Sequence, residues 1–334
     1  MSTNITASPL LPKSNNDDTR TTTKVIFSFV AILALIGNFM VLILFTRFPK
    51  WLKKKHYQCI INLAITDVLT AISLLVVPKF VQDPDAYPIP LTSSSREFYC
   101  RIVWSHFIPF SLGITSVYTC LVLAIERWLA VIRPVFYKER LDVRTMRILL
   151  VCCWVAGIVF ESPVISHVES YISDDNVTAL CKWVPEKEEG RIWALAIFLF
   201  AGQTLIPCCL IVAAYVHIFM RFKNKKVYSV STRRPLNSTS SNEENCTSQT
   251  LKRATIMMAI SSLALILCWL PNQLYFFGAQ LGYFALKASI PVRIVGVLVF
   301  MNSFMNPIIY GFMNRTFREG YRKLLLDLLP WKRS

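Results

Sequence analysis

Long parts of this sequence lack charge. No Asp, Glu, Lys or Arg occurs from Val25 to Phe45, or from Ala254 to Leu286. A soluble helical protein needs charged faces that recur every three or four residues, and these windows have none. Hydrophobic residues make up 54% of the chain and charged residues only 17%, so the composition argues against a soluble globular protein.

Other signatures are missing as well. The first 23 residues are largely polar and contain no apolar run of the signal-peptide type, so the first long apolar segment is expected to act as the insertion signal. No internal repeat is visible. The chain shows no metal-ligand cluster, no nucleophile and base set, and no phosphate-binding loop, and we therefore do not expect an enzyme.

Seven apolar stretches are long enough to cross a bilayer. A hydrocarbon core about 30 Å thick needs roughly 20 apolar residues of helix, because no water is present there to satisfy unpaired backbone groups. The stretches cover residues 24–46, 57–80, 98–132, 145–168, 191–221, 252–279 and 286–312. The predicted fold is an all-α membrane protein, a seven-transmembrane helix bundle.

A single membrane domain, residues 24–312, is the simplest organisation. Residues 1–23 would form an extracellular tail, and residues 313–334 a short amphipathic helix followed by a cytoplasmic tail. Within the domain, residues 222–251 include a segment rich in Ser, Thr and Asn with almost no apolar side chains. Such a segment has little to bury, so we expect a flexible third cytoplasmic loop.

The distribution of basic residues predicts the orientation, because loops rich in Lys and Arg stay cytoplasmic. With the N-terminus outside, the inner segments hold 24 of the 36 Lys and Arg residues and the outer segments hold 11. This bias, together with attraction to anionic inner-leaflet lipid, accounts for the formal charge of +16 without nucleic acid binding. We expect a multi-pass protein of the plasma membrane.

Only two of the ten cysteines, Cys100 and Cys181, lie on the predicted outer side. Two thiols alone in an oxidising compartment are expected to pair, which would tie the second outer loop to the third helix; the alternative is two free thiols. Sequons at Asn4 and Asn176 also fall outside, where glycosylation is possible.

Short motifs follow one another in order on the predicted helices. They are Gly37-Asn38, Asn62-Leu63-Ala64-x-x-Asp67, Glu126-Arg127-Trp128, Trp154, Pro207 with Tyr215, Cys268-Trp269-Leu270-Pro271, Asn302-Ser303, and Asn306-Pro307-Ile308-Ile309-Tyr310. Together they make the chain resemble the rhodopsin-like (class A) G-protein-coupled receptors over nearly its whole length. The stretches around Pro271 and Pro307 are most similar to neuropeptide receptors.

This resemblance implies a switch at the cytoplasmic side. Glu126 would hold Arg127 at rest, and the released arginine would face a heterotrimeric G protein; the alternative is an interfacial arginine that reaches lipid phosphate. Leu251 occupies a position where many relatives carry a second acid for the arginine, so we expect appreciable ligand-independent signalling. The other implied switch residues are Trp128, Val135 as a G-protein contact, Tyr215, Trp269, the hinge prolines Pro271 and Pro307, Asn306 and Tyr310.

The family's sodium pocket is implied too. It would consist of Asp67, Ser116, Asn302, Ser303 and Asn306, all of which carry the oxygen atoms that a hard cation prefers. Considered alone, Asp67 could equally be a neutral acid bonded to a neighbouring helix. An allosteric sodium ion is the only bound cofactor that we expect.

The outer half of the third helix carries no acid, which argues against a monoamine ligand. The expected pocket is aromatic and polar and consists of His106, Phe107, Phe110, Glu161, Trp183, Gln203, Gln273, Tyr275, Phe276 and Arg293. Such a lining suits a peptide. A receptor for a small non-amine molecule, chemosensory or orphan, and a non-signalling ligand-binding membrane protein stay open as alternatives.

Two further features concern the expected pocket. Glu161 could pair with a basic ligand group or with His106 if it faces the bundle, and would be neutral if it faces lipid or a dimer partner. The interval from Cys100 to Arg127 is two residues longer than is usual in the family, so we expect a distortion near the top of the third helix, at Pro109.

The end of the chain favours contact with lipid. Phe317, Tyr321 and Leu324 recur at helical spacing with Arg318 and Arg322 between them, as in a basic helix that lies on an anionic leaflet. The tail offers few hydroxyl groups. Arrestin recruitment is therefore expected through the Ser/Thr cluster of the third cytoplasmic loop.

Overall fold

The computed structural model describes residues 13–83, 86–172, 179–184, 186, 188–231, 240–283 and 290–328. The two expected glycosylation sites, Asn4 and Asn176, lie outside these residues. Within the described ranges, seven helical segments are long and apolar enough to span a membrane. They are Arg20–Arg47, Lys55–Val76, Phe107–Ile132, Val143–Ser166, Glu189–Asn224, Gln249–Gln280 and Pro291–Met313. The predicted seven-helix fold is confirmed.

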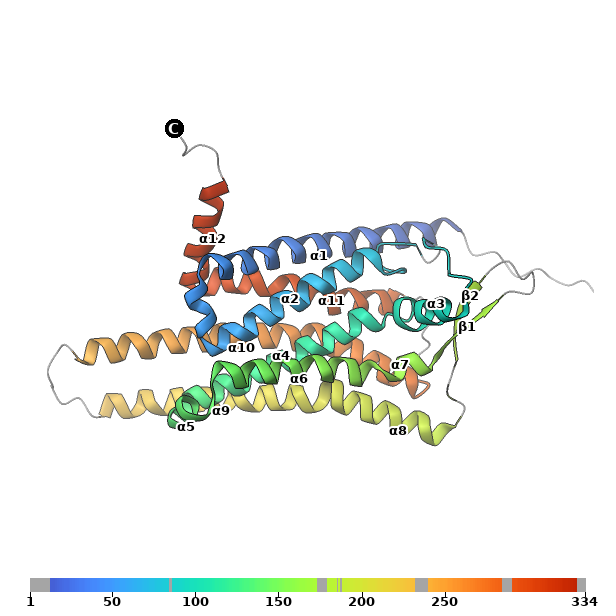
Figure 1. Cartoon of the computed structure of the whole chain (residues 1–334). Coiled ribbons are helices and arrows are strands. Elements are labelled where there is room, and N and C mark those ends of the chain that lie inside the picture. The colour runs from blue at the N-terminus through green and yellow to red at the C-terminus, as the bar shows by residue number, and fades with distance from the viewer. Residues whose placement is uncertain are drawn as a thin grey trace, which may run out of the picture.

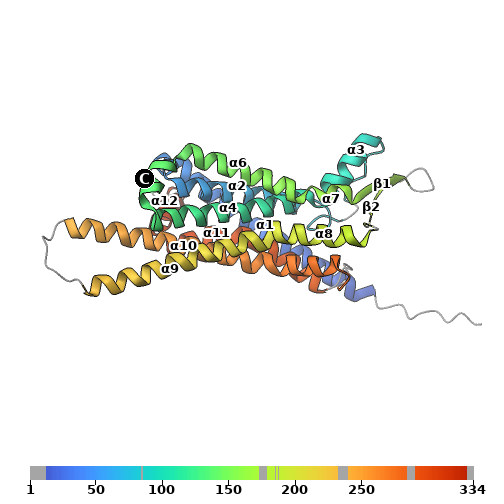
Figure 2. The same ribbon diagram turned by 90° about the horizontal axis from the view of Figure 1, so that it is seen from below.

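The spanning helices run alongside one another (Figures 1 and 2). They are α1 (Lys13–Arg47), α2 (Lys55–Val76), α4 (Phe107–Ile132), α6 (Val143–Glu161) with α7 (Pro163–Ser166), α8 (Glu189–Phe200) continued through the π-type turn η3 (Ala201–Leu205) into α9 (Ile206–Ser231), α10 (Ser240–Gln280) and α11 (Ile290–Met313). The connecting elements are the 3-10 turn η1 (Pro49–Lys53), α3 (Ser93–Phe98), the π-type turn η2 (Tyr99–Trp104), α5 (Pro134–Arg140), the strands β1 (Val168–Ile172) and β2 (Ala179–Trp183), and α12 (Arg315–Leu328).

The bundle has two distinct ends (Figure 1). The antiparallel hairpin β1–β2 and Cys181 lie at one of them, which we name the disulfide end. Arg127 lies near the last turn of α4 at the other, together with α5 and α12, and we name this the arginine end.

The helices bury their inner faces and leave apolar side chains on their outer faces. Leu63, Ile114 and Ile211 are fully enclosed, whereas Ile36 and Leu267 are more than half exposed. A bundle that is hydrophobic both inside and outside fits a lipid surrounding, because a soluble bundle would carry polar groups on its outer faces.

The third span is interrupted near the disulfide end. The sequence predicts one helix over 98–132 with a kink at Pro109; instead the helix breaks at His106, which adopts the left-handed conformation with φ 65°. Pro109 lies in the first turn of α4, where a missing N–H costs nothing. The wide π-type turn of η2 contains more residues per turn than an α-helix. This turn accommodates the extra residues between Cys100 and Arg127.

The segment 222–251 also differs from expectation. It is helical at both ends, since α9 continues to Ser231 and α10 begins at Ser240, and residues 232–239 lie outside the described ranges. Both views show α9 and α10 extending together beyond the rest of the bundle (Figures 1 and 2). A helix satisfies its own backbone in water as well as in lipid, so polar composition alone did not exclude one here.

At the arginine end α12 turns away from α11, as the amphipathic pattern predicts (Figure 1). Phe317 is fully buried within an aromatic cluster, which we define as Phe45, Trp51, Tyr57, Tyr310 and Phe317. The ring of Phe317 lies 5.3 Å from that of Trp51 and 5.4 Å from that of Tyr310. These contacts fix α12 to the bundle.

Candidate functional site

A cavity of about 720 Å³ lies at the disulfide end. Its described lining comes from α4, α6, α7, α8, α10, α11, η3, the hairpin and the connecting residues beside them: Ser105, His106, Phe110, Phe160, Glu161, Pro163, Val164, His167, Trp183, Val184, Glu186, Ile192, Leu195, Leu199, Gln203, Asn272, Gln273, Tyr275, Phe276, Gln280, Val292 and Val295. This volume and mainly apolar lining are typical of ligand pockets.

Eight of the ten predicted pocket residues line this cavity. Phe107 and Arg293 do not. Phe107 is buried in the first turn of α4 outside the lining, whereas Phe110, three residues on in the same helix, belongs to it. On α11, Val292 and Val295 line the cavity because they lie on the same helix face, and Arg293 lies on another face of this helix.

Sequence reasoning missed most of the apolar wall. Ile192, Leu195 and Leu199 form one face of α8 at spacings of three and four. The periodicity of such a stripe is visible in a sequence, but it does not distinguish a face that lines a cavity from one that faces lipid or the core.

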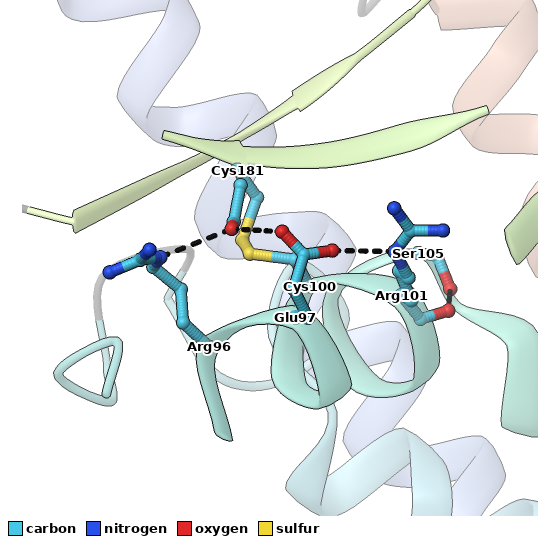
Figure 3. The surroundings of a disulfide bond; sticks show 7 residues. Arg96, Glu97, Cys100, Arg101, Ser105 and Cys181 are labelled. Carbon is cyan, nitrogen blue, oxygen red and sulfur yellow. Dashed lines mark hydrogen bonds and ion pairs between the residues drawn. A yellow bond between two sulfur atoms is a disulfide. The ribbon is translucent and has the colours of Figure 1, made fainter. Parts of the chain in front are cut away.

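The predicted disulfide between Cys100 and Cys181 is formed, with 5.5 Å between the two Cα atoms. Figure 3 shows Glu97 beside this bond, where its carboxylate accepts a hydrogen bond from Arg101 Nε at 2.6 Å. Ser170 lies opposite Cys181 in the hairpin, and its hydroxyl also donates a hydrogen bond to Glu97. The hydrogen bonds from Ser170 and then Arg101 lower the pKa of Glu97. The hairpin is thus fastened to η2.

The fastened hairpin positions Trp183 at the cavity wall. Its ring lies 5.6 Å from the ring of Trp104, and Lys79 Nζ lies 3.5 Å from the centre of the Trp104 ring. Desolvation lowers the pKa of Lys79 to about 8, although its side chain reaches the surface. Neither Lys79 nor Trp104 lines the cavity; they support Trp183 from behind.

The floor of the cavity leads to Trp269. This residue is buried in α10, two residues before Pro271, and its ring lies 6.5 Å from that of Phe110. The Trp269 ring fills the space beside Gly113, where an added Cβ would overlap it. Phe110, which lines the cavity, is therefore in contact distance of Trp269 in the middle of the bundle.

The five residues of the implied sodium pocket lie buried between α2, α4 and α11. Asn306 Nδ2 donates to Asp67 Oδ2 at 3.0 Å, and Asn306 Oδ1 accepts a hydrogen bond from the Ser261 hydroxyl. Ser116, Asn302 and Ser303 line a small cavity of about 10 Å³ that also touches Trp269. That volume is close to the space one water molecule requires.

Asn302 tests whether these residues fit a cation. Its Oδ1 is buried and has no hydrogen-bond partner among the described residues. Together with the carboxylate of Asp67 and the hydroxyls of Ser116 and Ser303, this oxygen gives the donor set that sodium prefers. The arrangement fits a small hard cation.

At the arginine end, Arg127 and Glu126 are almost fully buried and form an ion pair. Arg127 donates to the carboxylate from both Nε and Nη2. Nη2 also lies 3.2 Å from His56 Nδ1, and the Tyr137 hydroxyl donates to Glu126 Oε1 at 2.7 Å. A buried charge without a partner is costly, and two further side chains, His56 and Tyr137, contact this pair.

His56 and Tyr137 add contacts to the predicted resting pair, for which the sequence indicated only Glu126 as the partner of Arg127. Tyr137 comes from α5, which folds back under α4, and Lys55 fixes it by donating to its carbonyl oxygen at 2.6 Å. The helical pattern of 134–140 is too short to be read from sequence, so no signal placed this hydroxyl beside Glu126.

The remaining predicted switch residues lie on α4, α5, α9, α10 and α11. The Tyr215 hydroxyl lies 3.5 Å from Ser262 Oγ, and Trp128 Nε1 donates to His217 Nδ1 at 3.1 Å, which links α4 to α9. Val135 on α5 is 66% exposed at the surface. Pro271 and Pro307 lie inside α10 and α11, respectively.

Comparison with known proteins identifies relatives for this arrangement. Residues 37–310 match the family model described as 7 transmembrane receptor (rhodopsin family). The allatostatin-A receptor of Bombyx mori is 26% identical over 92% of this chain and 80% of its own length. Galanin receptor 2a of Danio rerio is 24% identical, over 90% of this chain and 76% of its length. Somatostatin receptor type 1 of Rattus norvegicus is 24% identical over 92% of this chain and 71% of its own length. The protein belongs to the rhodopsin family of seven-transmembrane receptors.

Proposed function

We propose that this protein is a peptide-activated, G-protein-coupled receptor whose disulfide end faces outward from the plasma membrane. The observation that carries the proposal is the pairing, in one bundle, of a ligand-sized cavity at one end with a buried Arg127–Glu126 pair at the other. The similarity to allatostatin-A, galanin and somatostatin receptors favours a peptide ligand.

The side chains between the two ends form the path for the signal. A ligand that contacts Phe110 or α10 would displace Trp269, which fills the space beside Gly113. The small cavity below Trp269 would then change shape together with Ser116, Asn302 and Ser303. In the resting state these residues and Asp67 would hold sodium, whose charge compensates the buried carboxylate.

The output would be the release of Arg127. The prolines inside α10 and α11 remove helix hydrogen bonds and permit these helices to bend at the arginine end. Arg127 would then exchange Glu126 for the G protein, with Tyr215 and Tyr310 supporting the new position. Val135 offers an exposed apolar contact on α5. Arrestin would bind the hydroxyl-rich third loop, and α12 would lie on anionic lipid.

The experiment measures G-protein activation in cells that express the wild type, Arg127→Ala or Arg144→Ala. Arg144 is exposed at the start of α6 and serves as the matched control. Cells are challenged with allatostatin A, galanin and somatostatin, and with a library of short amidated peptides. We expect a peptide response in the wild type and in Arg144→Ala that Arg127→Ala abolishes at equal surface expression. A response to small organic molecules but to no peptide would reject the peptide ligand, and no coupling at all would reject the receptor function.

A further inference from the structure

Glu161 is a buried acid on the wall of the disulfide-end cavity. It ends α6, is 8% exposed, and lines the cavity rather than facing lipid. Within the described part of the chain, no hydrogen bond or ion pair reaches its carboxyl group. An ionised carboxylate in such a place is stabilised only by a positive partner, since burial removes most of its water.

No described residue of the wall lies within ion-pair distance of Glu161. None of the described wall residues is Lys or Arg. The other acid, Glu186, already has Arg191 Nη1 at 3.9 Å. The amide nitrogen of Gln203 donates to the Phe160 carbonyl at 2.9 Å, which leaves the oxygen of that amide as an acceptor. Gln203 therefore offers an acceptor to the cavity and no positive charge.

His106 adds one more acceptor. Burial, and then the charge of Lys79, lower the pKa of His106 to about 3, so its imidazole is neutral at physiological pH. The ring is hydrogen-bonded to the Pro78 carbonyl, and a carbonyl only accepts, so one ring nitrogen carries the proton. Its Nε2 has no partner among the described residues and is left as an acceptor. A neutral histidine cannot be the counter-ion of Glu161.

We propose that the ligand of this cavity presents an ammonium or guanidinium group to Glu161, and that this carboxylate on α6 is the counter-ion that selects cationic ligands. The aromatic rings of Phe160, Trp183 and Tyr275 belong to the same wall, and their faces favour a cation. The inference rests on the proposed function only in taking this cavity as the ligand site.

A pair of small probes tests the proposal without knowledge of the natural ligand. Benzamidine is an aromatic cation, and benzamide is its neutral counterpart of nearly the same shape. The purified full chain in lipid nanodiscs is heated with 10 mM of either probe, and the apparent unfolding temperature is recorded. A probe that binds only the folded state raises this temperature by about 2 °C or more when its concentration is several times its dissociation constant.

We expect benzamidine to raise the unfolding temperature of the wild type and benzamide to leave it unchanged. Glu161→Gln keeps the shape of the side chain and removes its charge, so the shift should disappear. Glu161→Asp keeps the charge and should retain part of the shift. Glu169→Gln, on the exposed face of β1, is the matched control and should behave as the wild type does.

Three results would overturn the proposal: no shift with the wild type, equal shifts with both probes, or a full shift in Glu161→Gln. The assay measures binding and needs no G protein. Loss of signalling with an intact benzamidine shift would therefore reject the proposed function alone, whereas peptide signalling without any benzamidine shift would reject the counter-ion alone.

Discussion

Tyr137→Phe should raise the ligand-independent activity of the receptor. The substitution removes only the hydroxyl that donates to Glu126 Oε1 at 2.7 Å. It keeps the aromatic ring, over which Lys55 Nζ lies at 3.8 Å, so α5 should stay in place. If Glu126 gives up this bond when Arg127 is released, the change destabilises the resting state alone.

The magnitude follows from the chemistry of the bond. A hydrogen bond to a charged group contributes about 1.5 to 3 kcal/mol, and the lower value applies because Glu126 remains paired with Arg127. About 1.4 kcal/mol corresponds to a tenfold change in an equilibrium constant, so the active fraction should rise roughly tenfold while the resting state still dominates. The absence of a second acid at Leu251 makes this hydroxyl more important.

The assay is basal nucleotide exchange on the G protein in membranes, normalised to surface expression. Tyr171→Phe, on β1 at the opposite end, is the matched control and should leave the basal rate unchanged. A basal rate for Tyr137→Phe within about twofold of the wild type would refute the reasoning, because the bond would then contribute less than about 0.5 kcal/mol to the resting state.

Other changes test other parts of the molecule. Asp67→Asn removes the carboxylate of the sodium cluster, so 100 mM sodium should no longer lower agonist affinity in binding assays; an unchanged sodium effect would place the ion elsewhere. Gly157→Ala forces a methyl group against Thr115 and the Ser111 carbonyl and should destabilise the receptor by about 2 kcal/mol or more in thermal unfolding, whereas Gly190→Ala, which meets nothing within 4 Å, should be neutral. Acidification should also destabilise the receptor: His106 stays neutral down to about pH 3 when folded but takes up a proton near pH 6.5 when unfolded, so the unfolded state binds more protons between these values. Between pH 7 and pH 5 the free energy of unfolding should fall by about 2 kcal/mol. If the free energy of unfolding of His106→Gln fell as steeply with pH as that of the wild type, the loss would belong to other groups.

The sequence predicted the spanning helices because their signal is strong and local. A stretch of about 20 apolar residues has few soluble interpretations, so all seven spans were found, and only the start of the third differs markedly from the prediction, at Phe107 instead of residue 98. Local composition was less informative where helices leave the membrane. The polar ends of α9 and α10 satisfy their backbones within the helix and need no apolar face, which a prediction based on apolar content overlooks.

The site residues were likewise predictable from the sequence only where a local motif marks them. Motif residues such as Arg127 and Asn306 have fixed neighbours in the chain, and the structure pairs Arg127 with Glu126 and Asn306 with Asp67. His56 and Tyr137 reach the ion pair from α2 and α5, and only the packing of three helices brings them there. The break at His106 was missed because a left-handed histidine leaves no pattern in a sequence, whereas a nearby proline suggests a kink even where it is harmless.

The aromatic cluster at the arginine end has a consequence for the surrounding bilayer. Tyr310 and Phe317 are in ring contact, and Phe317 belongs to the helix whose basic face is suited to anionic lipid headgroups. Movement of Tyr310 therefore requires either that α12 moves with it or that the cluster opens. If anionic lipid holds α12 at the surface, as proposed above, it would oppose both changes. The anionic lipid content of the inner leaflet would then behave as an allosteric effector of this receptor, linked reciprocally to whatever occupies the cavity at the far end.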